Sequence, residues 1–170
     1  KGFLFAGISA GLKASNKKDL ALILAPEGSI FSGMFTQSIV RASCVDICEE
    51  KIKATSGFVR AILINSGQAN ACTGNLGIQH FQIATGKIAE LLGIKEEEVL
   101  MCSTGVIGVP IQINDLVKNL PNLVSDLKGN NFANAAEAIL TTDLTLKKVS
   151  IETIIQGRKI KIAWFAKGSG

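Results

Sequence analysis

Apolar and polar residues along this chain form short apolar runs between polar loops, which predicts several β-strands. Residues 20–25 are apolar on both faces, so the predicted strand 19–25 should be a central one. Near the C-terminus, two apolar-rich runs flank the turn Gln156-Gly157, a pattern typical of a hairpin. The predicted strands are residues 3–8, 19–25, 30–35, 59–65, 99–102, 147–155 and 158–165.

Other segments carry apolar residues at spacings of three and four, which predicts amphipathic helices. In the first of these helices the repeating positions are Val45, Cys48 and Ile52, and the second should end at Gly93. A third helical stretch contains Pro121, which we expect to break it. The predicted helices are residues 43–53, 75–92, 113–128 and 132–140.

The composition fits one globular domain spanning residues 1–170. Of its 170 residues, 47% are hydrophobic and 19% charged, a balance that excludes intrinsic disorder. The net charge of +4 is mild, and aromatic residues make up only 5% with no Tyr, so a nucleic-acid-binding module is not indicated. No apolar run is long enough for a membrane-spanning helix.

Cysteine and histidine usage argues against a metal site. The four cysteines form no Cys-x-x-Cys pair, and His80 is the only histidine, which excludes zincins and any site that needs a second histidine. Scattered thiols suit a reducing compartment and are usually small buried hydrophobes. We therefore expect no cofactor, and a location in the cytoplasm or in an organelle matrix.

Four segments could carry chemistry. Thr104-Gly105 follows a buried strand, where backbone N–H groups and a hydroxyl can form an oxyanion hole, although the glycine could simply end the strand. The loop 65–74 could recognise a polar small molecule or bond to its own backbone. Thr141-Thr142-Asp143 could be a plain helix end, and Lys167 could meet a substrate carboxylate or belong to a flexible terminus.

Taken together and in order, these segments resemble the ornithine acetyltransferase (ArgJ) family. The resemblance covers nearly the whole chain, with weaker matches at residues 7–13, 19–23 and 34–36. The motifs that carry it are Asn-Ser-Gly-Gln-Ala-Asn-Ala-Cys-Thr-Gly (65–74), Ser-Thr-Gly-Val-Ile-Gly (103–108), Ala-Ile-Leu-Thr-Thr-Asp (138–143) and Ala-Lys-Gly-Ser-Gly (166–170).

The resemblance implies an enzyme made as a precursor that cuts itself after the Lys-Gly-Ser-Gly motif, before a Thr that begins a β chain. This chain would be the α chain, with an α/β fold of mixed sheets layered with helices, of the ArgJ and DmpA kind, completed by that β chain in an α2β2 assembly. The β-chain Thr would take acetyl from N-acetylornithine, release ornithine and pass the acetyl group to glutamate. An N-terminal Thr needs no histidine, because its own α-amine can serve as base. Acetyl-CoA is a further donor in some members.

Carried over by motif, the resemblance makes Thr104 and Gly105 the oxyanion hole. It makes Thr141, or its neighbour Thr142, and Lys167 the residues that hold the amino-acid substrate. The chain departs from the family pattern at residues 37–38, 144–146 and 163–165. None of these departures changes Thr104, Gly105, Thr141 or Lys167. They leave open which acetyl donor the enzyme would prefer.

Two alternatives remain open from the sequence. A related self-processing amidohydrolase or aminopeptidase would use the same oxyanion hole with water as acceptor. A non-catalytic binding domain would be complete at 170 residues and would need no partner chain.

Overall fold

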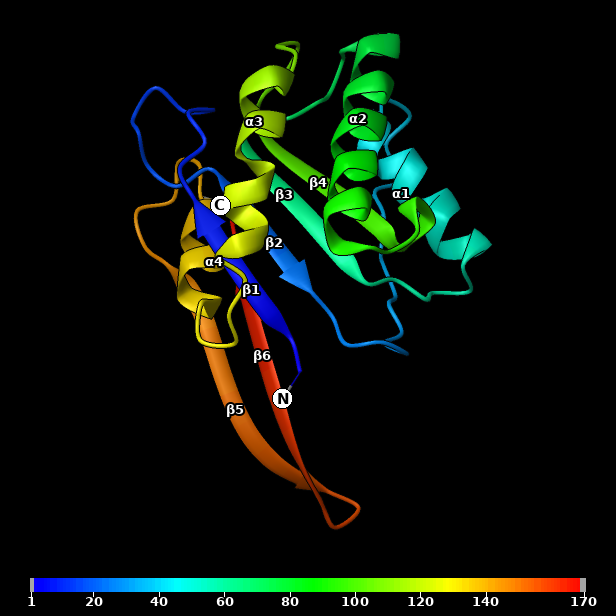
Figure 1. The fold of residues 1–170 in the computed structure, drawn as a ribbon, viewed down its shortest axis with the longest axis vertical. Coiled ribbons are helices and arrows are strands. Elements are labelled where there is room, and N and C mark those ends of the chain that lie inside the picture. Colours follow the sequence, from blue (N-terminus) through cyan, green and yellow to red (C-terminus); the bar gives the residue numbers. More distant parts are fainter. Residues whose placement is uncertain (1, 169–170) are drawn as a thin grey trace.

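The computed structural model describes residues 2–168, and its centre is a mixed four-stranded sheet (Figure 1). The strands lie in the order β1-β2-β3-β4. Their bounds are β1 Leu4–Ile8, β2 Leu20–Leu24, β3 Ala61–Gln68 and β4 Val99–Val106. The first two pairings are antiparallel and the third is parallel.

The parallel pairing of β3 with β4 requires a crossover, which helix α2 (Gly74–Leu92) supplies. Gly93 ends α2 in the left-handed conformation, at φ 64°, as its sequence position predicts. A single 3₁₀ turn, η1 (Glu96–Glu98), then leads into β4.

One face of the sheet carries the main core. Helices α1 (Ser43–Ala54), α2 and α3 (Ile113–Ser125) cover this face. Alternate strand residues point into it, because side chains of a strand alternate between faces. Among the fully buried side chains of this core are Leu20, Leu22, Leu63, Phe81, Ile88, Met101, Leu116, Leu120 and Leu123.

The opposite face carries the short helix α4 (Phe132–Ala138) and part of a hairpin. Ala21 packs there against Ala135 and Ala138. Gly7 in β1 permits a close approach, since a Cβ at this position would lie inside 3.0 Å of the Asn134 backbone in α4.

The hairpin consists of β5 (Lys147–Ile155) and β6 (Arg158–Ala166), which extend away from the sheet in Figure 1. Gln156 and Gly157 both have positive φ, 50° and 75°, as a two-residue turn between twisted strands requires. The predicted hairpin is therefore confirmed, as is the mixed α/β class.

The predicted strand at residues 30–35 is wrong. Only one isolated bridge forms there, between Ile30 and Phe58, and Met34 is fully exposed. The segment lies outside both sheets, so within the described part of the chain it has no neighbouring strand to pair with.

Several predicted boundaries also differ, and α3 and α4 end at Ser125 and Ala138, short of the predicted residues 128 and 140. β3 and β4 continue beyond their apolar runs as far as Gln68 and Val106, because the two strands remain paired through these polar residues. Helix α3 passes through Pro121 without a break, since its buried face continues from Leu120 to Leu123. Tertiary packing here outweighs the local preference of the residues.

The cysteine prediction holds for two of the four thiols. Cys44 and Cys48 are buried in α1, and burial raises the pKa of Cys48 to about 11, whereas Cys72 and Cys102 are exposed. Of the helices in residues 2–168, none combines the length and apolar character needed to cross a membrane.

We predict that Gly7→Ala destabilises the fold by about 1–3 kcal/mol, because the new methyl group must push α4 away from the sheet. Gly86→Ala in the middle of α2 is the matched control. Its Cβ would meet nothing closer than 3.6 Å, so this variant should be neutral or up to about 1 kcal/mol more stable. Urea unfolding of both variants measures the difference, and equal stability would show that α4 does not rest on Gly7.

Candidate functional site

Thr104 and Gly105 lie near the end of β4, inside the strand rather than in the loop expected after it. Gly105 pairs with Gly67 of β3, and both have positive φ, 133° and 130°. A Cβ on Gly105 would lie inside 3.0 Å of the Gly67 backbone, so only glycine fits. β4 is an edge strand of the described sheet, which leaves its outer side open for other contacts.

Thr104 is nearly buried, at 7% exposed, and its hydroxyl contacts Lys167. The Lys167 ammonium donates a hydrogen bond to Oγ1 of Thr104. A hydroxyl that accepts a hydrogen bond still keeps its own proton to donate, and an ammonium has three donors. Thr104 can therefore donate to an oxyanion while Lys167 binds a second acceptor.

Thr141 is connected to the same place through Asp143. The carboxylate of Asp143 accepts the backbone N–H of Thr141 at 3.4 Å through one oxygen and that of Gly168 at 2.8 Å through the other. Gly168 directly follows Lys167, so one carboxylate ties the two predicted substrate-binding residues together. Lys147 donates to the same oxygen of Asp143 at 2.9 Å and also to the Gly168 carbonyl.

These contacts favour the ionised form of Asp143. The hydrogen bond from Lys147, supported by the N–H groups of Thr141 and Gly168, lowers the pKa of the Asp143 carboxyl below its usual range. The structure thus brings all four predicted residues into one cluster with a fixed negative charge beside two lysines.

The asparagines of the polar segment 65–74 bond to nearby parts of the chain, whereas Ser66 and Gln68 bond to the distant backbone carbonyls of Ala138 and Leu12. The Asn70 side chain donates to the Gly77 carbonyl at 3.0 Å and accepts from the Thr73 hydroxyl at 3.0 Å. The Asn65 side chain donates to the Gln68 carbonyl at 3.0 Å. These contacts of the two asparagines are the kind that the self-bonding alternative expects, and they hold the backbone on either side of Gly67.

Lys13 and Asp19 border this cluster and were not among the site residues predicted from the sequence. The Lys13 ammonium donates to the Leu140 carbonyl at 2.5 Å, directly before Thr141, and burial lowers the pKa of Lys13. Asp19 is fully buried and accepts three backbone N–H groups. The signal available in the sequence was a charged residue at the head of a run that is otherwise apolar.

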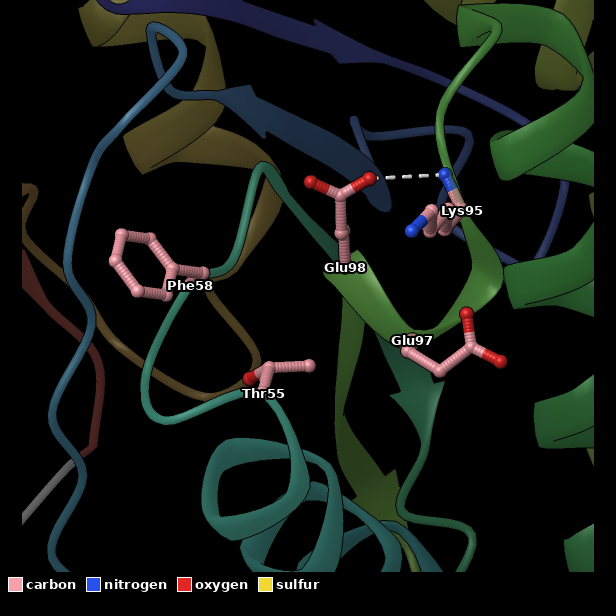
Figure 2. A pocket seen from close by; sticks show the side chains of 5 residues that line it. All are labelled: Thr55, Phe58, Lys95, Glu97 and Glu98. Carbon is pink, nitrogen blue, oxygen red and sulfur yellow. Dashed lines mark hydrogen bonds between the residues drawn. The ribbon is translucent and has the colours of Figure 1, made fainter.

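Two hollows lie elsewhere on the surface. One, of about 510 Å³, is lined by Thr55, Phe58, Lys95, Glu97 and Glu98 at the start of β4, whereas Thr104 lies near its end. Figure 2 shows the two glutamates pointing in different directions, with Glu98 accepting the backbone N–H of Lys95 at 3.0 Å. These carboxylates do not converge on a common point.

The second hollow is an apolar groove of about 860 Å³ between the α4 face of the sheet and the hairpin. Phe5, Ile23, Ile62, Trp164 and Phe165 are among its lining residues. It lies outside the Thr104 cluster, since none of the four predicted site residues lines it.

The known sequences that resemble this chain point to one family. The model of the ArgJ family matches residues 4–170. A protein of Prochlorococcus marinus subsp. pastoris named arginine biosynthesis bifunctional protein ArgJ is 75% identical over 169 residues, which is 99% of this chain. A protein of the same name from Nostoc sp., ArgJ 1, is 45% identical over the whole chain. The chain spans only 42% and 41% of the length of these two relatives.

Solved structures agree with the sequence match. The crystal structure of arginine biosynthesis bifunctional protein ArgJ from Bacillus halodurans superposes with a TM-score of 0.93 at 33% identity, covering 100% of this chain and 88% of that one. Ornithine acetyltransferase complexed with ornithine from Mycobacterium tuberculosis gives 0.91 at 32% identity, covering 99% and 89%. The chain therefore belongs to the ArgJ family.

Proposed function

We propose that this chain is the α chain of an ornithine acetyltransferase of arginine biosynthesis. It would be a single domain that works with a β chain cut from the same precursor. The observation that carries the proposal is the Lys167–Thr104 contact, which joins two separate family motifs at one point. The ornithine present in the M. tuberculosis relative supports an amino-acid substrate.

In the proposed first step the β-chain Thr hydroxyl attacks the acetyl carbonyl of N-acetylornithine. Its proton passes to the Thr α-amine and then to the departing amine of ornithine, so that a C–O bond replaces a C–N bond. The carbonyl oxygen becomes negative in between, and the Thr104 hydroxyl with the Gly105 N–H stabilises it. Glutamate then attacks the acetyl ester, which gives N-acetylglutamate and frees the Thr.

The substrate residues follow from the same cluster. Lys167 has donors left after its bond to Thr104, and it would bind the substrate carboxylate through a charge-assisted hydrogen bond. Thr141, placed beside it by Asp143, would supply a hydroxyl, with Thr142 as the alternative. No cofactor enters this scheme, and acetyl-CoA stays a candidate second donor.

Exposed apolar surface on this chain supports the proposal that it has a β-chain partner. Met34 and Ile39 are fully exposed, and Trp164 is 49% exposed beside the apolar groove. Exposed apolar patches commonly mark interfaces, and the relatives are more than twice as long as this chain. The remainder of the precursor is thus the proposed partner in an α2β2 assembly, and the cytoplasmic location stays a prediction.

Mass spectrometry of the denatured full-length gene product tests self-cleavage. We expect two chains, the second beginning with Thr and gaining one acetyl group after brief exposure to N-acetylornithine. A single uncut chain without an adduct would contradict the proposal and favour a binding domain. Release of acetate that does not depend on glutamate would instead indicate a hydrolase.

Replacing Thr104 tests the oxyanion hole. We expect Thr104→Ala to lower kcat for acetyl transfer about 10²–10³-fold, because one donor to the oxyanion is lost. Thr104→Ser, which keeps a hydroxyl, should recover most of this rate. Thr55→Ala removes a threonine hydroxyl near the start of β4 and should leave kcat unchanged. A Thr104→Ala rate within a few-fold of wild type would rule out the assignment.

Replacing Lys167 tests carboxylate binding. A hydrogen bond to a charged group contributes about 1.5–3 kcal/mol, so Lys167→Met should raise KM for N-acetylornithine about tenfold or more. Lys118→Met, an exposed lysine on α3, is the matched control and should leave KM unchanged. Steady-state kinetics measure both, and an unchanged KM in Lys167→Met would remove Lys167 from the substrate site.

A further inference from the structure

The carboxylate of Asp19 organises the loop that precedes β2. Asp19 is 0% exposed, and its Oδ1 accepts the backbone N–H of Ala10 at 2.6 Å. Its Oδ2 accepts the N–H groups of Leu12 at 2.7 Å and Lys13 at 3.0 Å. A buried carboxylate is tolerated only where such bonds satisfy it, and here the bonds define the path of residues 9–13.

This loop touches the paired glycines directly. The Leu12 carbonyl accepts the side-chain amide of Gln68 at 2.8 Å. A Cβ on Gly67 would lie 2.6 Å from the same carbonyl, so Leu12 limits where the Gly67 backbone can be. Gly67 pairs with Gly105, and a Cβ on Gly105 would lie 2.3 Å from the Gly67 backbone. A shift of the loop would therefore also shift Gly105 in the proposed oxyanion hole.

A second connection runs through the backbone of Asp19 itself. Its carbonyl accepts the Ser66 N–H at 2.8 Å. Ser66 pairs with Thr104 in the sheet, and its hydroxyl donates to the Ala138 carbonyl at the end of α4 at 2.5 Å. Ser66 thus connects the Asp19 backbone with both Thr104 and α4.

The loop also reaches the substrate-binding side. Lys13 is held by Asp19 through its N–H, while its ammonium donates to the carbonyls of Leu140 and Lys18 at 2.5 and 2.9 Å. Leu140 is adjacent to Thr141. The same short loop therefore contacts β3, which pairs with the β4 part of the cluster, and Leu140, which directly precedes Thr141.

We propose that Asp19 is a positioning residue that sets the place of Gly105 relative to Thr141 by holding the loop 9–13 in shape. It acts through this loop and does not touch substrate. An effect of Asp19 on catalysis rests on the proposed function of Gly105 and Thr141. The structural coupling between the segments that carry these two residues does not rest on it.

Asp19→Asn tests the coupling in the full-length gene product. The amide keeps the size of the side chain but replaces one acceptor oxygen with a donor, so at least one N–H of the loop loses its partner. Asp46→Asn is the matched control, because it removes a carboxylate of α1 that pairs with Arg41, on the other face of the sheet. Both variants are compared with wild type at a temperature where circular dichroism shows them folded.

Hydrogen exchange followed by mass spectrometry is the readout that does not depend on activity. In Asp19→Asn we expect faster exchange at residues 10–13, 66–69, 104–106 and 141–142, with α1 and α2 unchanged. Faster exchange confined to 10–13, or spread evenly over the whole chain, would overturn the proposal. If this variant does not fold, hydrogen exchange of Lys13→Met is measured in its place. Faster exchange at residues 141–142, with 66–69 unchanged, supports the coupling of loop 9–13 to Thr141. Unchanged exchange at 141–142 overturns it.

Kinetics add the catalytic readout. A displacement of about 1 Å at a reacting group can cost 10²-fold in rate, so Asp19→Asn should lower kcat at least about tenfold, while Asp46→Asn stays within twofold. A wild-type kcat in Asp19→Asn would overturn the positioning role. Absence of acetyl transfer in the wild-type protein would instead refute the proposed function, and the exchange pattern would still decide the coupling.

Discussion

The close approach of two backbones, at Gly67 in β3 and Gly105 in β4, is the constraint on which the candidate site depends. No side chain fits between them, and both residues hold a positive φ that other residues rarely adopt. This approach keeps the two parallel strands paired beyond their apolar cores, so Thr104 remains in the sheet. A hydroxyl on a strand has less freedom than one on a loop, which suits a group that must meet a developing charge.

The alternation of side chains along the strands separates stability from chemistry. Residues such as Leu63 point toward α1, α2 and α3, where the large core lies, while Ser66 and Thr104 point toward α4 and the end of the hairpin. The second face carries a smaller cluster of alanines, isoleucines and aromatic rings. The site could therefore acquire polar and charged groups without replacing the residues that hold the sheet together.

Charge around the site is balanced by short local contacts. Asp143 is surrounded by Lys147 and two backbone N–H groups, which lowers its pKa and keeps it negative. Lys13 bonds to backbone carbonyls and Lys167 to a hydroxyl, so neither is neutralised by a direct ion pair within residues 2–168. Lys13 and Lys167 thus give the site positive character, which agrees with the proposed binding of an amino-acid carboxylate.

The sequence alone determined the periodic elements, the hairpin turn and the family, because these depend on local patterns and on motifs in order. It also supplied Thr104, Gly105, Thr141 and Lys167 as candidates, although their roles came from resemblance. It could not show that β3 and β4 extend through polar residues, that residues 30–35 lack a strand partner, or that α3 continues through Pro121, since each depends on neighbours distant in sequence. The connection from Asp19 to Gly67 and Thr141 was decided only by the tertiary structure, because a buried carboxylate and its N–H partners become one unit only when the chain folds around them.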